Sequence, residues 1–230
     1  MWSGPRNIST AMMRSFSSRS DTVVVDEPLY AHYLAETGID HPGRADILAS
    51  QPGTWQEVAA QLTAPLPDDA RVQYQKHMTH HLLDGIDRGW LEPMTHAYLI
   101  RDPAHVIASY AKVRAMPTLE ELGFPQQREI YRRFGGPVVD AADILIDPRG
   151  MLKQLCMALY IPWDVAMLHW PRGPHPSDGV WAPHWYSAVE KTTCFGPYDA
   201  RPAEVPPHLR PLLDRAMPYY EELSAVAIRP

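Results

Sequence analysis

Cations and hydroxyls that directly follow a tight turn are the residues of this chain best suited to bind an anion. Arg6, Ser9 and Thr10 follow the turn-forming run Ser3-Gly4-Pro5. From Ser9 onward, apolar residues recur at helical spacing, which predicts a helix. Backbone N–H groups at a helix start point outward, and the helix dipole favours negative charge there. The stretch predicts a loop that binds phosphate or sulfate, made of Gly4, Pro5, Arg6, Asn7, Ile8, Ser9 and Thr10.

The structural alternative for this stretch is an ordinary helix start capped by serine or threonine. Loops that bind ATP or GTP carry a Gly-Lys pair before a serine or threonine, which holds the phosphates and magnesium. This stretch has no such pair. The sequence therefore argues against a nucleoside triphosphate loop.

A second stretch with anion-binding chemistry begins at Arg101. Residues 97–100 form an apolar run typical of a buried strand, and Asp102-Pro103 is a strong helix start. Arg101 then leaves the strand end, and Ser109 lies about two turns into the helix. A guanidinium and a hydroxyl so placed can clamp one phosphate between them. A purely structural strand-to-helix junction is the alternative.

Candidate proton acceptors follow two other predicted strands. Glu27 closely follows the β-branched run 21–25, and Lys76 and His77 directly follow the predicted strand 71–75. Ligands of open α/β sheets bind at these carboxyl ends. Glu27 is the first candidate for a general base. A capping or arginine-paired carboxylate is the alternative, and the residues leave both open.

The run from Lys76 to His81 carries four side chains that can be cationic, which are Lys76, His77, His80 and His81. They are predicted to face an anionic ligand, and a partly buried histidine cluster is the alternative. Zinc is a weaker hypothesis because no carboxylate or cysteine completes a metal-binding spacing. We therefore predict no metal site.

Composition bounds the class of protein. The chain has 230 residues, a net charge of −6, 45% hydrophobic residues and two cysteines. These values predict a single domain over residues 1–230, disfavour nucleic-acid binding and fit a reducing, cytoplasmic compartment. No apolar run is long enough for a membrane span. The oligomeric state stays open.

Three segments resemble those of the PAPS-dependent sulfotransferase superfamily, and of its small bacterial members in particular. The loop from Gly4 to Thr10 resembles the one that cradles the 5′-phosphosulfate, with Asn7-Ile8 in place of the usual Ser-Gly. Arg101 and Ser109 match the pair that holds the 3′-phosphate. The segment 143–160 resembles a structural segment of that family. The resemblance implies an α/β fold like that of P-loop nucleotide kinases, with a parallel sheet flanked by helices.

The resemblance also implies a reaction. PAPS, 3′-phosphoadenosine 5′-phosphosulfate, would give a sulfuryl group to a hydroxyl or amine of a small-molecule acceptor and leave PAP, without a metal. Arg6 would stabilise the leaving phosphate, with Glu27 as the base. His77 is the second candidate base, because cytosolic members use a histidine after a Lys-x motif, and here it follows Lys76 directly. Lys191, Thr192 and Thr193 are expected at the 3′-phosphate.

One departure from the family concerns the first strand. Only Met1-Trp2-Ser3 precedes the loop, so the strand is truncated or the natural start lies upstream. Two other classes of function are distinct from a sulfotransferase. A non-catalytic PAP- or PAPS-binding module would keep Arg6, Arg101 and Ser109 without a base, and a small-molecule kinase would need the missing Gly-Lys pair.

Overall fold

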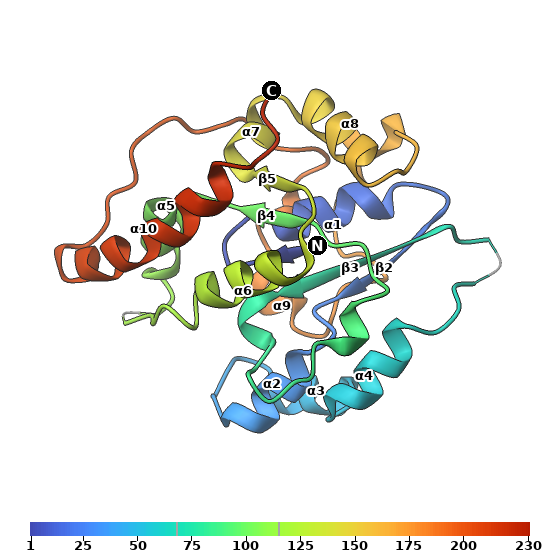
Figure 1. Ribbon diagram of the computed structural model, residues 1–230, viewed down its shortest axis with the longest axis horizontal. Coiled ribbons are helices and arrows are strands. Elements are labelled where there is room, and N and C mark those ends of the chain that lie inside the picture. Colours follow the sequence, from blue (N-terminus) through green and yellow to red (C-terminus); the bar gives the residue numbers. More distant parts are fainter. Residues whose placement is uncertain (68, 115) are drawn as a thin grey trace.

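The computed structural model describes residues 1–67, 69–114 and 116–230. At its centre lies a parallel sheet with the strand order β2-β3-β1-β4-β5 (Figure 1). The strands are β1 (Trp2–Ser3), β2 (Thr22–Asp26), β3 (Val72–Met78), β4 (Tyr98–Ile100) and β5 (Val138–Asp140). This confirms the predicted α/β fold. Strands β2 and β3 lie on one side of β1, and β4 and β5 lie on the other, so β1 marks the switch point where ligands of such sheets bind.

The central strand is only two residues long. Trp2 pairs with His77 on one side and with Tyr98 on the other. The strand ends at Gly4 and Pro5, and a Cβ on Gly4 would lie 2.6 Å from the carbonyl oxygen of Leu122. Gly4 is therefore required by close packing against the neighbouring segment.

Helices connect and flank the strands. In chain order they are α1 (Ser9–Ser17), α2 (Tyr30–Thr37), α3 (Arg44–Ser50), α4 (Trp55–Leu62), α5 (Pro103–Tyr110), α6 (Phe124–Phe134), α7 (Ala141–Ile146), α8 (Pro148–Ala158), α9 (Ala182–Trp185) and α10 (Arg210–Ser224). Figure 1 shows α2, α3 and α4 gathered beyond β2 and β3, and α7 and α8 next to β5.

Two helix starts follow from local signals. Helix α7 ends at Ile146 and α8 begins at Pro148, because Asp147 caps the new helix at the Gly150 N–H and Pro148 has no N–H to continue the old one. Helix α6 begins at Phe124, after Gly123 with a φ of 75°. The cap predicted at Asp102 is present and accepts from the Ala104 N–H at 2.7 Å.

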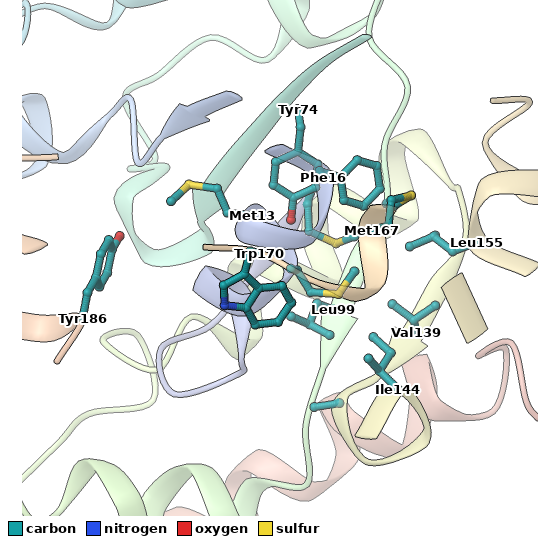
Figure 2. Packing of buried hydrophobic residues seen from close by; sticks show 14 of the residues in the cluster. Met13, Phe16, Tyr74, Leu99, Val139, Ile144, Leu155, Met167, Trp170 and Tyr186 are labelled. Carbon is teal, nitrogen blue, oxygen red and sulfur yellow. The ribbon is translucent and has the colours of Figure 1, made fainter. Parts of the chain in front are cut away.

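Each face of the sheet packs against its own set of helices. Leu99 and Val139 point toward α1, α7 and α8, whereas their neighbours Tyr98 and Val138 point toward α4, α6 and α10. Figure 2 shows the rings of Phe16 and Tyr74 stacked on the first of these faces, with centroids 4.3 Å apart. This alternation decides which strand-end side chains share a site.

Candidate active site

A cavity of about 460 Å³ opens at the carboxyl ends of the strands, around the loop between β1 and α1. Its charged lining residues, among those the structure describes, are Arg6, Glu27, Lys76 and Arg101. Arg6 follows the end of β1 and Arg101 follows the end of β4. Glu27 lies at the end of β2, and Lys76 lies near the end of β3. The cavity therefore spans the switch point and has a cationic side and a side that holds a carboxylate.

The predicted anion loop lines this cavity from Pro5 to Thr10, while Gly4 lies outside the lining. The first backbone bond of the helix runs from the Met12 N–H to the Ile8 carbonyl, and no acceptor among the described residues is recorded for the N–H groups of residues 7–11. Those groups stand at the positive end of α1, as an anion site requires.

The loop holds this shape at a conformational cost. Arg6 and Ile8 have φ values of 63° and 50°, in the left-handed region that β-branched residues rarely adopt. Glu27 has a φ of 39°. Of the four non-glycine residues with positive φ in the described parts of the chain, these three line the cavity. Such strain gathers at functional sites, where the surrounding structure over-determines it.

The second predicted anion-binding pair lies directly against the loop. Arg101 donates from an Nη atom to the Arg6 carbonyl at 2.6 Å, and Arg6 donates from Nε to the Ser109 hydroxyl at 2.9 Å. Burial lowers the pKa of Arg101, and the nearby Arg6 guanidinium lowers it further. Two cations are thus held close together, an arrangement that an anion would relieve.

A buried polar network faces them from β2 and β3. Asp26 and Lys76 are direct partners in the strand register, and Lys76 Nζ donates to Asp26 at 2.9 Å and to Glu27 at 2.5 Å. The hydroxyl of Tyr186 accepts from Lys76 at 2.8 Å and donates to Asp26 at 2.7 Å. Trp181 donates its indole N–H to the same hydroxyl at 3.0 Å. Each charge in this network therefore has a partner.

The network sets the proton affinity of Glu27. Burial raises the pKa of this carboxyl; Lys76 opposes the shift, and the Asp26 charge reinforces it. Burial alone would lower the pKa of Lys76, but the two carboxylates hold it well above its ordinary value. One ammonium thus lies between two carboxylates, and burial gives the Glu27 carboxylate a raised proton affinity. A carboxylate of this kind is suited to general base catalysis.

Neutral aromatic rings form the rest of this side of the cavity. We call them the aromatic wall, which consists of Tyr30, His41, His80, His81 and Trp185. His81 stacks on Tyr30 at 4.6 Å, and the Tyr30 hydroxyl meets His41 Nδ1 at 2.8 Å. Burial lowers the pKa of His80 to about 3 and that of His81 well below its ordinary value. Of the four side chains at this strand end that can be cationic, burial favours the neutral form of the three histidines.

His77 does not reach this cavity, which corrects its prediction as a second candidate base. Side chains alternate along β3, so Lys76 faces the α1 side and His77 the opposite one. The His77 ring stacks on Trp2 with centroids 4.2 Å apart and meets the Gln75 amide at 3.0 Å. It lines a different cavity, of about 510 Å³, which contains the amino end of β3.

Of the three C-terminal candidates for the 3′-phosphate site, Thr192 lines the cavity. Its hydroxyl already donates to the Val189 carbonyl at 2.7 Å and accepts from the Trp170 indole at 3.2 Å. Lys191 and Thr193 are exposed and do not line the cavity. The structure thus brings together the loop, Arg101, Ser109, Glu27 and Lys76, and separates them from these two residues.

Sequence reasoning missed several residues of the site. Asp26 had a detectable signal, because it ends a buried strand beside Glu27, and the wall residue Tyr30 follows soon after in the chain. Tyr186 had none, because it lies 160 positions from the Asp26 that it contacts. Among the described residues, no group of three histidine, cysteine, aspartate or glutamate side chains is arranged to hold a metal.

Comparison with known proteins agrees with this geometry. The family model described as "Sulfotransferase domain" matches residues 1–227. The chain belongs to the sulfotransferase domain family. Two solved structures share its fold. They are the sulfotransferase domain of the curacin biosynthetic pathway (TM-score 0.56, 14% identity, covering 100% of this chain and 97% of that one) and that of the Synechococcus PCC 7002 olefin synthase (TM-score 0.51, 16% identity, covering 93% and 92%).

Closer sequence relatives of this sulfotransferase domain occur in Arabidopsis thaliana. "Branched-chain-amino-acid aminotransferase-like protein 1" is 37% identical over 229 residues, and "protein 2" of the same name is 34% identical over 227. The matches cover 97% and 96% of this chain but only 41% and 40% of the relatives. The sulfotransferase domain thus spans less than half the length of these curated relatives. No helix among its described residues is long and apolar enough to cross a membrane.

Proposed function

We propose that this protein transfers a sulfuryl group from PAPS to a hydroxyl or amine of a small-molecule acceptor. The observation that carries the proposal is one cavity with opposite chemistry on its two sides. Arg6 and Arg101 lie on one side, and Glu27 with a raised pKa lies on the other. Group transfer between an anionic donor and a protic acceptor needs both.

The residues on the cationic side fit the donor. The N–H groups of residues 7–11 have no acceptor among the described residues and would hold the 5′-phosphosulfate together with Arg6, Ser9 and Thr10. Arg101 and Ser109 would hold the 3′-phosphate, as the family resemblance implies. The fit rests on two guanidiniums held together with a hydroxyl, which is a strong donor set for phosphate.

The donor would supply an activated sulfuryl group, whose sulfur leaves the phosphate oxygen as it bonds to the acceptor oxygen or nitrogen. Arg6 and the loop N–H groups stabilise the negative charge that develops on the leaving phosphate. Glu27 accepts the acceptor proton. Lys76, held by Asp26 and Tyr186, is a positioning residue that orients the Glu27 carboxylate.

Both cysteines are free thiols, which supports the cytoplasm as the compartment.

Calorimetric titration with PAP, the desulfonated donor, tests the donor site. We expect PAP to bind more tightly than AMP or ATP, because only PAP carries the 3′-phosphate. Arg101→Ala should weaken PAP binding by about 10-fold to 100-fold, the loss of a charge-assisted contact. Arg149→Ala is the matched control, an exposed arginine of α8 outside the cavity lining. Equal affinity for PAP and AMP, unchanged by Arg101→Ala, would contradict the donor assignment.

A PAP-binding protein without catalysis would pass that titration. Turnover of PAPS with a panel of acceptors separates the two functions, and Glu27→Gln should keep PAP affinity while abolishing turnover. Loss of PAP binding in Glu27→Gln would instead mean that this carboxylate shapes the donor site.

A further inference from the structure

The two sides of the cavity have different positions in the sheet. The loop after β1 lies in the middle, Arg101 lies at the end of β4, and the aromatic wall lies beyond the ends of β2 and β3. A donor whose phosphates contact the loop and Arg101 leaves the aromatic wall and Glu27 to the acceptor. The chemistry of that wall therefore selects the acceptor.

Charge on the acceptor side is already balanced by the protein. Lys76 is the one cation there among the described lining residues, and Asp26 and Glu27 both accept from its ammonium. Near His41, Arg114 is paired with Glu121 at 2.7 Å. An acceptor carboxylate or phosphate would find no available cation and would lie beside Glu27. Burying it there would carry a large desolvation cost.

An ammonium group is disfavoured for a different reason. The position beside Glu27 that a substrate ammonium would occupy is taken by Lys76 Nζ, at 2.5 Å from the carboxylate. A second cation there would be repelled by Lys76 and by the two guanidiniums across the loop. The acceptor side thus disfavours both signs of charge.

The wall offers rings and unused hydrogen-bonding capacity. His81 stacks between Tyr30 and Tyr33, at 4.6 and 4.7 Å. His80 and His81 are 7% and 2% exposed, and the buried Nδ1 atom of each ring has no hydrogen-bond partner among the described residues. Stacked rings favour an apolar, planar ligand body, and a neutral imidazole can form a hydrogen bond with an uncharged hydroxyl or ether oxygen.

We propose that the acceptor is an uncharged alcohol on an apolar, ring-bearing body that the aromatic wall contacts, and that acceptors carrying a carboxylate or an ammonium group on that body are excluded. This inference rests on the proposed function, since it assigns the second substrate of the same cavity. Tyr30 and His41 are specificity-determining residues for that substrate.

Ligand-observed NMR on the PAP-loaded protein tests this with three matched probes. They are 4-methylbenzyl alcohol, 4-(hydroxymethyl)benzoate and 4-(aminomethyl)benzyl alcohol, which share a ring and a hydroxyl and differ in charge. We expect the neutral probe to bind at least about 10-fold more tightly than either charged probe, the loss produced by about 1.4 kcal/mol. The carboxylate or ammonium probe binding as tightly as the neutral one would overturn the proposal.

A variant pair keeps the test independent of folding defects. His41→Lys adds a cation to the half-buried edge of the wall. It should reduce the ratio of the affinity for the neutral probe to that for the carboxylate probe by at least about 5-fold. His169→Lys, at an exposed position outside the cavity lining, should leave it unchanged. The same affinity ratio in His41→Lys as in His169→Lys would overturn the role of the aromatic wall in selecting the acceptor. If PAP binds but no probe does, the acceptor inference fails alone; if PAP does not bind, the proposed function fails.

Discussion

Lys76 and His77 are neighbours on β3, and both are almost completely buried, at 1% and 3% exposure. Lys76 stays charged because Asp26 lies opposite it in the strand register and Glu27 follows. His77 stays neutral because burial lowers its pKa, and among the described residues no carboxylate opposes that shift; its ring contacts Trp2 and Trp90 instead. Burial pushes both groups toward neutrality, and only a compensating charge in the right register reverses that. A single step along the strand thus separates a buried charged network that lines the cavity from a buried neutral side chain that does not.

The largest expected difference between the two faces is in catalysis. Glu27→Gln should lower kcat by about 10²-fold to 10⁴-fold, because it removes the proton acceptor while keeping the shape. His77→Gln should change kcat less than about 3-fold, because that ring lies in another cavity. Steady-state kinetics with PAPS measures both variants. A deep loss of turnover in His77→Gln would show that the two faces are coupled.

The next effect is on stability. Lys76→Met leaves Asp26 and Glu27 buried without their cation and should destabilise the protein by about 3–5 kcal/mol near pH 7. The triple variant with Asp26→Asn and Glu27→Gln should recover much of that loss, because it removes the unpaired charges. Urea unfolding at constant pH gives both free energies. A Lys76→Met variant as stable as the wild type would show that the network carries no net charge coupling.

The neutral histidines predict an acid-sensitive fold. The pKa of His77 is depressed well below 6.5 by burial, so below pH 6.5 the unfolded chain binds a proton there that the folded chain does not. Stability should therefore fall as pH falls, by about 1.4 kcal/mol per pH unit for each such histidine. Thermal unfolding between pH 7.5 and 5.5 should show that stability depends less steeply on pH in His77→Gln than in the wild type. An unchanged slope would mean that His77 already accepts a proton in the folded state.

The last effect concerns the packing around His77. Trp2 donates its indole N–H to His96 Nδ1 at 3.0 Å. Trp2→Phe removes this bond and some buried ring, and should cost about 1–3 kcal/mol while PAP affinity stays unchanged. Calorimetry and urea unfolding on the same sample separate the two readouts. A drop in PAP affinity would place this face inside the donor site.

Local features of the fold could be predicted well from the sequence. The turn at Gly4-Pro5, the helix from Ser9 and the cap at Asp102 each depend on residues only a few positions apart. The start of α8 at Asp147-Pro148 is a local capping signal of the same kind.

The site was predictable only where its residues are close together in the sequence. Arg101 and Ser109 belong to one strand-helix unit, so their placement at the same strand end could be derived from spacing alone. The histidines after β3 could not be assigned a charge from sequence, because the burial that keeps them neutral comes from α2 and the loop around His41. His77 was misplaced because alternation fixes a face only when the register is known.

The sequence by itself determined where an anion could bind, since a helix start, a turn and a guanidinium are local objects. The tertiary structure decided which groups carry charge and which side of the sheet each one serves. Lys76 keeps its proton through a carboxylate 50 positions away, and that carboxylate meets a tyrosine hydroxyl 160 positions further on. Protonation and accessibility depend on the dielectric and partners that folding assembles, and no segment of the chain contains those on its own.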